Sequence, residues 1–112
     1  MMKTPALLQA LCVLGVLGLF CGGAAHAQTG QSQRGEAFAA ANCAQCHAIG
    51  RSGTSPVAAA PVFRDIHRRY PVSQLAEALA EGIMTGHGAM PEFQLSESQI
   101  VDFLAYLATL ER

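Results

Sequence analysis

The segment Cys43-Ala44-Gln45-Cys46-His47 places two thiols three positions apart and an imidazole directly after the second thiol. Thiols and imidazoles bind metals and react with electrophiles, so this pattern carries chemistry. A disulfide between Cys43 and Cys46 would close a very short loop, and loop closure stabilises least when the loop is short. A structural crosslink is therefore a poor explanation of this pair.

The N-terminal part of the chain has the order of a secretory signal peptide. A short, positively charged start precedes an apolar run over residues 10–21, and small residues then lead to an Ala-x-Ala sequence that ends at Ala27. We therefore expect residues 1–27 to be removed on export to the periplasm. The remaining chain then holds no cysteine besides Cys43 and Cys46.

Two other readings of this N-terminal segment stay open. The first is an uncleaved membrane anchor. The apolar run is shorter than a transmembrane helix, which needs about 20 residues, so such an anchor would have to include polar residues in the span. Membrane association is expected only in that case. A lipid-modified Cys21 is disfavoured, because the bulky Phe20 stands where lipoprotein signals place a small residue.

The C-x-x-C-H pattern is the attachment signal for c-type haem. Two thiols can add to the two vinyl groups of haem and form two thioether bonds, and His47 can then reach the iron as a ligand. A thioredoxin-like redox pair would need a surrounding βαβ pattern, which the sequence lacks. A zinc site completed by His67 and His87 would have spacings of 21 and 20 residues, unlike common zinc modules. We predict one haem c, bound covalently through Cys43 and Cys46.

The charges of the expected mature chain exclude one class of partner. Residues 28–112 contain six arginines, no lysine and eight acidic residues, a formal charge of 6 − 8 = −2. This is unlike the basic surface of a nucleic-acid-binding protein. Three of the arginines form a local cluster, Arg64, Arg68 and Arg69, which can face solvent, pair with haem propionates or guide a partner.

The pattern of apolar residues predicts three helices and no strand. A short Ala-rich helix is expected over residues 35–41, directly before the first cysteine. Apolar residues at helical spacing predict a second helix over 72–83. Ser96 and Gln99 form a capping-box pattern that opens the third helix. We therefore predict an all-α domain whose small core is completed by the haem.

The rest of the chain reads as loops and a flexible start. Residues 50–61 and 85–91 are rich in glycine and proline and predict loops. Residues 28–33 are polar and without periodicity, which predicts a flexible mature N-terminus. The expected organisation is a signal peptide over 1–27, this short segment, and one domain over 34–112.

With these features together, the sequence resembles class I, mono-haem cytochrome c over about residues 34–110. Gly35 lies eight residues before the first cysteine, Met90-Pro91 lies where the family carries its second iron ligand, and residues 102–107 resemble its C-terminal helix. The resemblance implies a three-helix domain wrapped around one covalent haem. It also implies that the first and last helices cross closely at the glycine.

One departure from the family pattern concerns the first helix. The family has an aromatic residue four positions before the first cysteine, and this chain has Ala39 there. Phe38 lies one position away, so the contact of the first helix with Tyr106 is expected to differ in detail.

The iron ligands predicted from the sequence and the resemblance are His47 and Met90. Met90 lies in a glycine-rich loop that can bend to present its thioether, whereas Met84 falls at a helix end. His87, in the same loop, is the rival ligand, and two histidines would give a lower potential than histidine with methionine.

The resemblance implies two further residues in the haem pocket. A ligating histidine donates its other ring N–H to a fixed acceptor, and in this family the acceptor is a proline carbonyl. We expect Pro61 rather than Pro56 to supply it for His47, and Phe63 to line the haem.

The function expected from these residues is one-electron transfer in the periplasm, with no substrate transformed and hence no enzyme activity. A periplasmic dehydrogenase is the expected type of donor, and an oxidase or reductase the expected type of acceptor. A fixed haem subunit of one enzyme is also compatible with the sequence. The alternative is a haem sensor or peroxidase-like protein, in which the second iron ligand is weak or absent.

Overall fold

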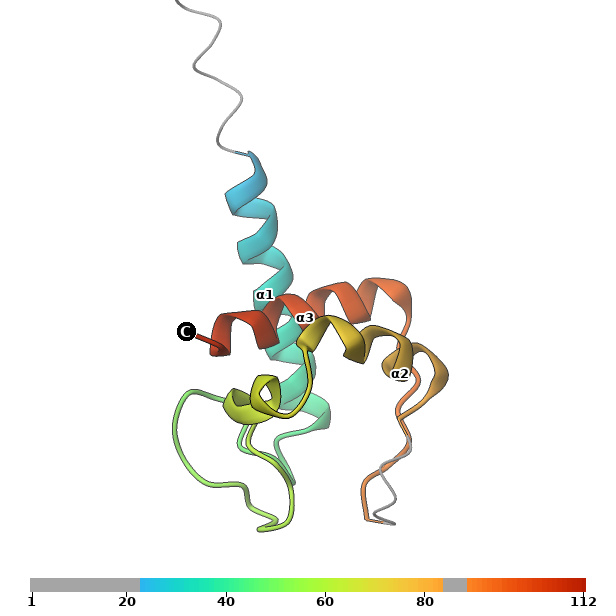
Figure 1. Cartoon of the computed structure of the whole chain (residues 1–112). Coiled ribbons are helices and arrows are strands. Elements are labelled where there is room, and N and C mark those ends of the chain that lie inside the picture. The colour runs from blue at the N-terminus through green and yellow to red at the C-terminus, as the bar shows by residue number, and fades with distance from the viewer. Residues whose placement is uncertain (1–22, 84–88) are drawn as a thin grey trace, which may run out of the picture.

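The computed structural model of the chain describes residues 23–83 and 89–112. Helices account for all regular structure in these two ranges, and the predicted all-α fold is confirmed. Figure 1 shows the long first helix crossed by the last one, with the shorter helices lying beside the last one. In chain order the elements are α1 (Gly23–Asn42), the 3₁₀ helices η1 (Phe63–Arg68) and η2 (Val72–Gln74), α2 (Leu75–Glu81) and α3 (Glu97–Leu110).

The close crossing of α1 and α3 takes place at Gly35. A Cβ atom at this position would fall 2.6 Å from the carbonyl carbon of Asp102 and 2.8 Å from Cβ of Tyr106. Carbon atoms at such distances overlap, so only a residue without a side chain permits this approach of the two backbones. The close crossing expected at Gly35 is present.

An ion pair holds the same crossing from its outer side. The Arg34 guanidinium donates two hydrogen bonds to the Asp102 carboxylate, at 2.7 Å from Nε and 2.8 Å from Nη2. These bonds hold the pKa of Asp102 below its usual range and raise the pKa of Arg34. Because both groups reach solvent, the pair fixes the geometry of the crossing more than it adds stability.

The first helix is longer than the sequence predicted. It begins at Gly23 instead of Gly35 and includes residues 28–33, which were expected to be flexible and are helical here. The segment has no apolar periodicity to announce a helix, but Ala-rich residues precede it and it contains no proline. Once a helix is nucleated, each added residue gains one backbone hydrogen bond, so propagation does not need an apolar face.

The second and third helices begin and end at chemically defined residues. Pro71 precedes η2, which leads directly into α2, and α2 ends at Gly82, whose φ of 101° suits a residue without a side chain. At the start of α3, Gln99 N–H donates to the Ser96 hydroxyl, and Ser96 N–H donates to the Gln99 side chain. The predicted capping box is therefore confirmed.

The protein core lies around α3, between it and α1, η1 and α2, and is small. Aromatic rings link three of these elements, because Phe103 of α3 has its ring 5.9 Å from that of Phe38 and 5.7 Å from that of Phe63. Ala39 is fully buried, so the position that carries an aromatic residue in the family holds a small side chain here, and Phe38 packs beside it. The buried apolar residues are Ala39, Phe63, Leu79, Leu95, Ile100, Phe103, Tyr106, Leu107 and Leu110.

Among the helices of residues 23–83 and 89–112, none is both long enough and apolar enough to cross a membrane. The apolar run over residues 10–21 lies outside the described residues. The predicted cleavage after Ala27 therefore stays a prediction.

We expect Gly35→Ala to destabilise the protein by about 3 kcal/mol, because the added methyl group overlaps backbone atoms of α3 that cannot move aside. This cost exceeds the gain of about 1 kcal/mol that alanine brings to a helix interior. Urea unfolding of the purified protein measures it. Gly50→Ala is the matched control, because a Cβ there meets no atom within 4 Å. Equal effects of the two substitutions would contradict a steric role for Gly35.

Candidate haem site

The two cysteines follow directly from the C-terminal end of α1. Cys43 N–H donates to the Ala39 carbonyl at 2.8 Å, and His47 N–H donates to the Cys43 carbonyl at 2.9 Å. One further helical turn therefore runs through the motif. Cys43 and Cys46 both carry free thiols and both are half-buried.

The imidazole of His47 is held by a backbone carbonyl. Its Nδ1 lies 2.7 Å from the Pro61 oxygen, and because a carbonyl only accepts, Nδ1 carries the proton in this contact. In the tautomer that this contact selects, the other ring nitrogen, Nε2, carries the lone pair through which an imidazole binds a metal. The proline carbonyl implied by the resemblance is thus in contact with the motif histidine.

Phe63 also contacts the motif histidine and the residue after it. Its ring centroid lies 5.1 Å from that of His47, and its N–H donates to the Ala48 carbonyl at 3.0 Å. Because Phe63 begins η1, these contacts join the motif to the helix that follows the loop.

Burial also affects one of the thiols. It raises the pKa of Cys43, and the nearby Cys46 raises it further. Cys43 is therefore a neutral thiol at neutral pH. With haem bound, Cys43 and Cys46 would supply the sulfur atoms for thioether bonds to its two vinyl groups.

Several hydrogen bonds fix the loop that follows the motif, and the sequence did not predict them. Ala48 N–H donates to the Ser55 hydroxyl at 3.0 Å, and Val57 N–H donates to the Cys46 carbonyl at 3.2 Å. Tyr106 of α3 donates its hydroxyl to the Ile49 carbonyl at 2.7 Å. The sequence predicted that Tyr106 lies on the last helix, but no pattern in it indicated the hydrogen-bond acceptor of the Tyr106 hydroxyl.

The predicted second ligand lies at the edge of the described residues. Met90 is half-buried, whereas its rivals Met84 and His87 fall outside the residues that the structure describes. Figure 1 shows that the segment after residue 88 and the loop after the motif extend from the same end of the helical domain, one on each side. Ligation by Met90 stays a prediction.

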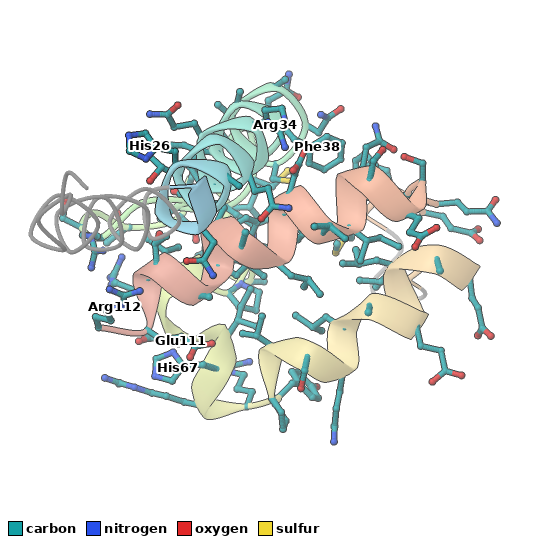
Figure 2. The ribbon with its side chains drawn as sticks, turned by 90° about the horizontal axis from the view of Figure 1, so that it is seen from above. His26, Arg34, Phe38, His67, Glu111 and Arg112 are labelled. Carbon is teal, nitrogen blue, oxygen red and sulfur yellow. The ribbon has the colours of Figure 1, made fainter. Side chains whose placement is uncertain are left out.

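The residues present fit a covalent haem better than a bare metal ion. In residues 23–83 and 89–112, no three side chains of the metal-binding types come together. His67, one ligand of the zinc alternative, lies beside Glu111 at the edge of a shallow surface depression (Figure 2). Two free thiols one helical turn apart, followed by an oriented imidazole, form the donor set that haem attachment requires.

Comparison with known proteins agrees with this geometry. Residues 30–107 match the family described as cytochrome c oxidase, cbb3-type, subunit III. The chain belongs to this family of c-type cytochromes. Covalent c-type haem is accordingly its cofactor, and Cys43 and Cys46 fit the motif through which such haem is attached.

Two curated relatives give the same assignment. The cytochrome is 34% identical over 68 residues to cytochrome c-552 of Bradyrhizobium diazoefficiens, a match that covers 61% of this chain and 64% of the relative. It is 36% identical over 77 residues to cytochrome c6 of a Picosynechococcus strain, with 62% and 64% covered. The matches thus span less than two thirds of either relative. No solved structure matches the chain significantly.

The hydroxyl of Tyr106 is expected to stabilise the cytochrome in a pH-dependent way. Burial raises the pKa of Tyr106, the Glu36 charge adds to the rise, and Arg51 opposes it. The stabilisation is then fully present below the ordinary tyrosine pKa of about 10 and is lost as the pH rises through the higher folded pKa. We expect Tyr106→Phe to cost about 1 kcal/mol at neutral pH by leaving the Ile49 carbonyl without its donor.

Urea unfolding of both proteins over a pH series measures this difference. It should stay constant up to about pH 10 and shrink above it. A difference that shrinks on acidification instead would show that another group is responsible.

Proposed function

We propose that the cytochrome is a one-electron carrier whose haem iron is ligated by His47 and Met90. The observation that supports this most directly is the hydrogen bond from Nδ1 of His47 to the Pro61 carbonyl. It orients the imidazole that directly follows two free thiols in the sequence. When bound, haem supplies an iron that cycles between ferrous and ferric states. The chain's own residues hold the cofactor and supply its iron ligands, and no substrate is transformed.

Ligation by a methionine would distinguish a carrier from an enzyme. Two filled axial positions leave no place on the iron for oxygen or peroxide, so we propose that the protein is not an enzyme. If Met90 does not bind the iron, the open position instead favours a haem sensor or a peroxidase-like protein.

We also propose export to the periplasm, with cleavage near Ala27. There the carrier would accept electrons from a donor such as a dehydrogenase and pass them to an acceptor such as an oxidase or reductase. The description of the matching family, which names an oxidase subunit, favours one second candidate, a haem subunit fixed within an enzyme.

Substitutions at Met90 test the ligation. A thioether is a soft, neutral ligand that favours ferrous iron, so it keeps the potential high. Met90→His should keep the iron six-coordinate and lower its potential. Met90→Ala should lower the potential and let carbon monoxide bind the ferrous haem. Redox titration and the carbon monoxide difference spectrum measure these effects.

Met84→Ala is the matched control for this series, because it removes the other methionine of the mature chain. It should change neither the potential nor carbon monoxide binding. Unchanged properties of Met90→Ala would make His87 the first alternative ligand. Rapid carbon monoxide binding by the unsubstituted protein would favour the sensor or peroxidase reading.

N-terminal sequencing of the haem protein from a periplasmic fraction tests the export. The expected first residue is Gln28 or one within a few positions of it. Recovery of the intact chain in the membrane fraction, with Met1 retained, would favour the anchored form.

A further inference from the structure

Positive and negative charges are segregated along the second half of the chain. Arg64, Arg68 and Arg69 fall within six residues, with Asp65 as the one acid among them. Residues 70–111 contain six carboxylates and no lysine or arginine. The arginine cluster is therefore a local positive region on a protein of negative mature charge, and such regions steer association with oppositely charged surfaces.

The structure places two of these arginines on the surface, where Asp65 lies near one of them. Arg68 has 72% of its side chain exposed, and its separation of 3.5 Å from Asp65 is long for an ion pair. Arg69 and Tyr70 follow at the end of η1 and are also exposed, Tyr70 at 59%. We refer to these three side chains, Arg68, Arg69 and Tyr70, as the η1 face.

Two other arginines of the mature chain are already engaged by hydrogen bonds. Arg34 is bound to Asp102 through two hydrogen bonds. Arg51 donates to the carbonyls of Thr109 and Arg112 at the end of α3. Arg64 is half-buried, and its Nη1 atom is shielded from solvent. Arg68 and Arg69 of the η1 face are adjacent in the chain and both exposed.

A shallow depression lies next to the η1 face. It is lined by residues directly after Tyr70 and by the C-terminal half of α3, with His67 and Glu111 among its lining residues, and Figure 2 shows these two side chains near each other. Arginine and tyrosine are enriched at protein–protein interfaces, because they bring large contact areas together with polar ends. An exposed tyrosine beside two exposed arginines suits an acidic segment with apolar residues between its carboxylates.

The η1 face is also close to the haem ligand through the protein. η1 begins at Phe63, whose ring lies 5.1 Å from that of His47 and whose N–H is bonded to the Ala48 carbonyl. A partner bound at the other end of this six-residue 3₁₀ helix is thus one short element from the ligating imidazole.

We infer that the η1 face docks an acidic segment of a redox partner protein, with carboxylates on Arg68 and Arg69 and an apolar residue against Tyr70. The inference rests on the proposed carrier function for the role of the partner. The binding itself is measured without electron transfer, so its failure is distinguishable from failure of that function.

Amide chemical-shift mapping of the haem-loaded protein at low ionic strength tests the docking. The probe is a synthetic peptide in which glutamate and leucine alternate, and a lysine–leucine peptide of equal length is the reversed-charge control. The acidic peptide should shift amides of residues 64–73, and 0.5 M salt should abolish the effect. Arg68→Gln with Arg69→Gln should weaken binding about three- to tenfold, and Tyr70→Ser should also weaken it.

A second double variant separates local from net charge. Gln28→Glu with Gln33→Glu lowers the net charge by the same two units on exposed positions of α1, and it should leave peptide affinity nearly unchanged. Equal losses in both variants would overturn the proposal, as would shifts scattered over the whole surface. Tighter binding to vesicles that contain phosphatidylglycerol than to the peptide would assign the face to a membrane instead.

Discussion

The close crossing of α1 and α3 at Gly35 is the constraint on which the rest of this structure depends. With no side chain at that position, the backbone of α3 lies directly on α1, and the Arg34–Asp102 pair fixes the angle from outside. Because the cysteine motif follows immediately after α1, its position relative to α3 is set at the same time. The geometry of the cofactor site thus begins with the absence of one methyl group, eight residues earlier in the chain.

The crossing also allows α3 to hold the loop after the motif. Tyr106, whose Cβ lies near Gly35, sends its hydroxyl to the Ile49 carbonyl, while Phe103 packs against Phe63 beside the His47 ring. One face of α3 therefore contacts the helix before the motif, the loop after it and the residue against its imidazole. A single helix thus supports three segments around the motif, which suits a domain with so small a core.

The haem-attachment motif and the local hydrogen bonds were predictable from the sequence. The length of α1 and the hydrogen bonds between distant parts of the chain were not. The C-x-x-C-H motif and the capping box at Ser96 are patterns of short spacing, and the proline carbonyl for His47 was implied by the family resemblance. The structure contains both the capping box and the contact of His47 with Pro61. The early start of α1 was missed because residues 28–33 carry no apolar periodicity. The contact of Tyr106 with Ile49 spans 57 positions, and no local pattern encodes a partner at that distance. Ligation by Met90 depends on a cofactor and on a loop that lies partly outside the described residues.

The two ends of the domain meet at the helix crossing, and this has a consequence for how the chain acquires its structure. Arg34 and Asp102 are 68 positions apart, so the contact that orients the motif forms only after α3 has been synthesised. During synthesis α1 and the motif emerge without α3 to support them, and the first half of the sequence has no complete core of its own. Folding is therefore expected to wait for the C-terminal helix. Bringing α1 close to α3 closes a long loop at an entropic cost, and only the contacts between the two helices offset that cost.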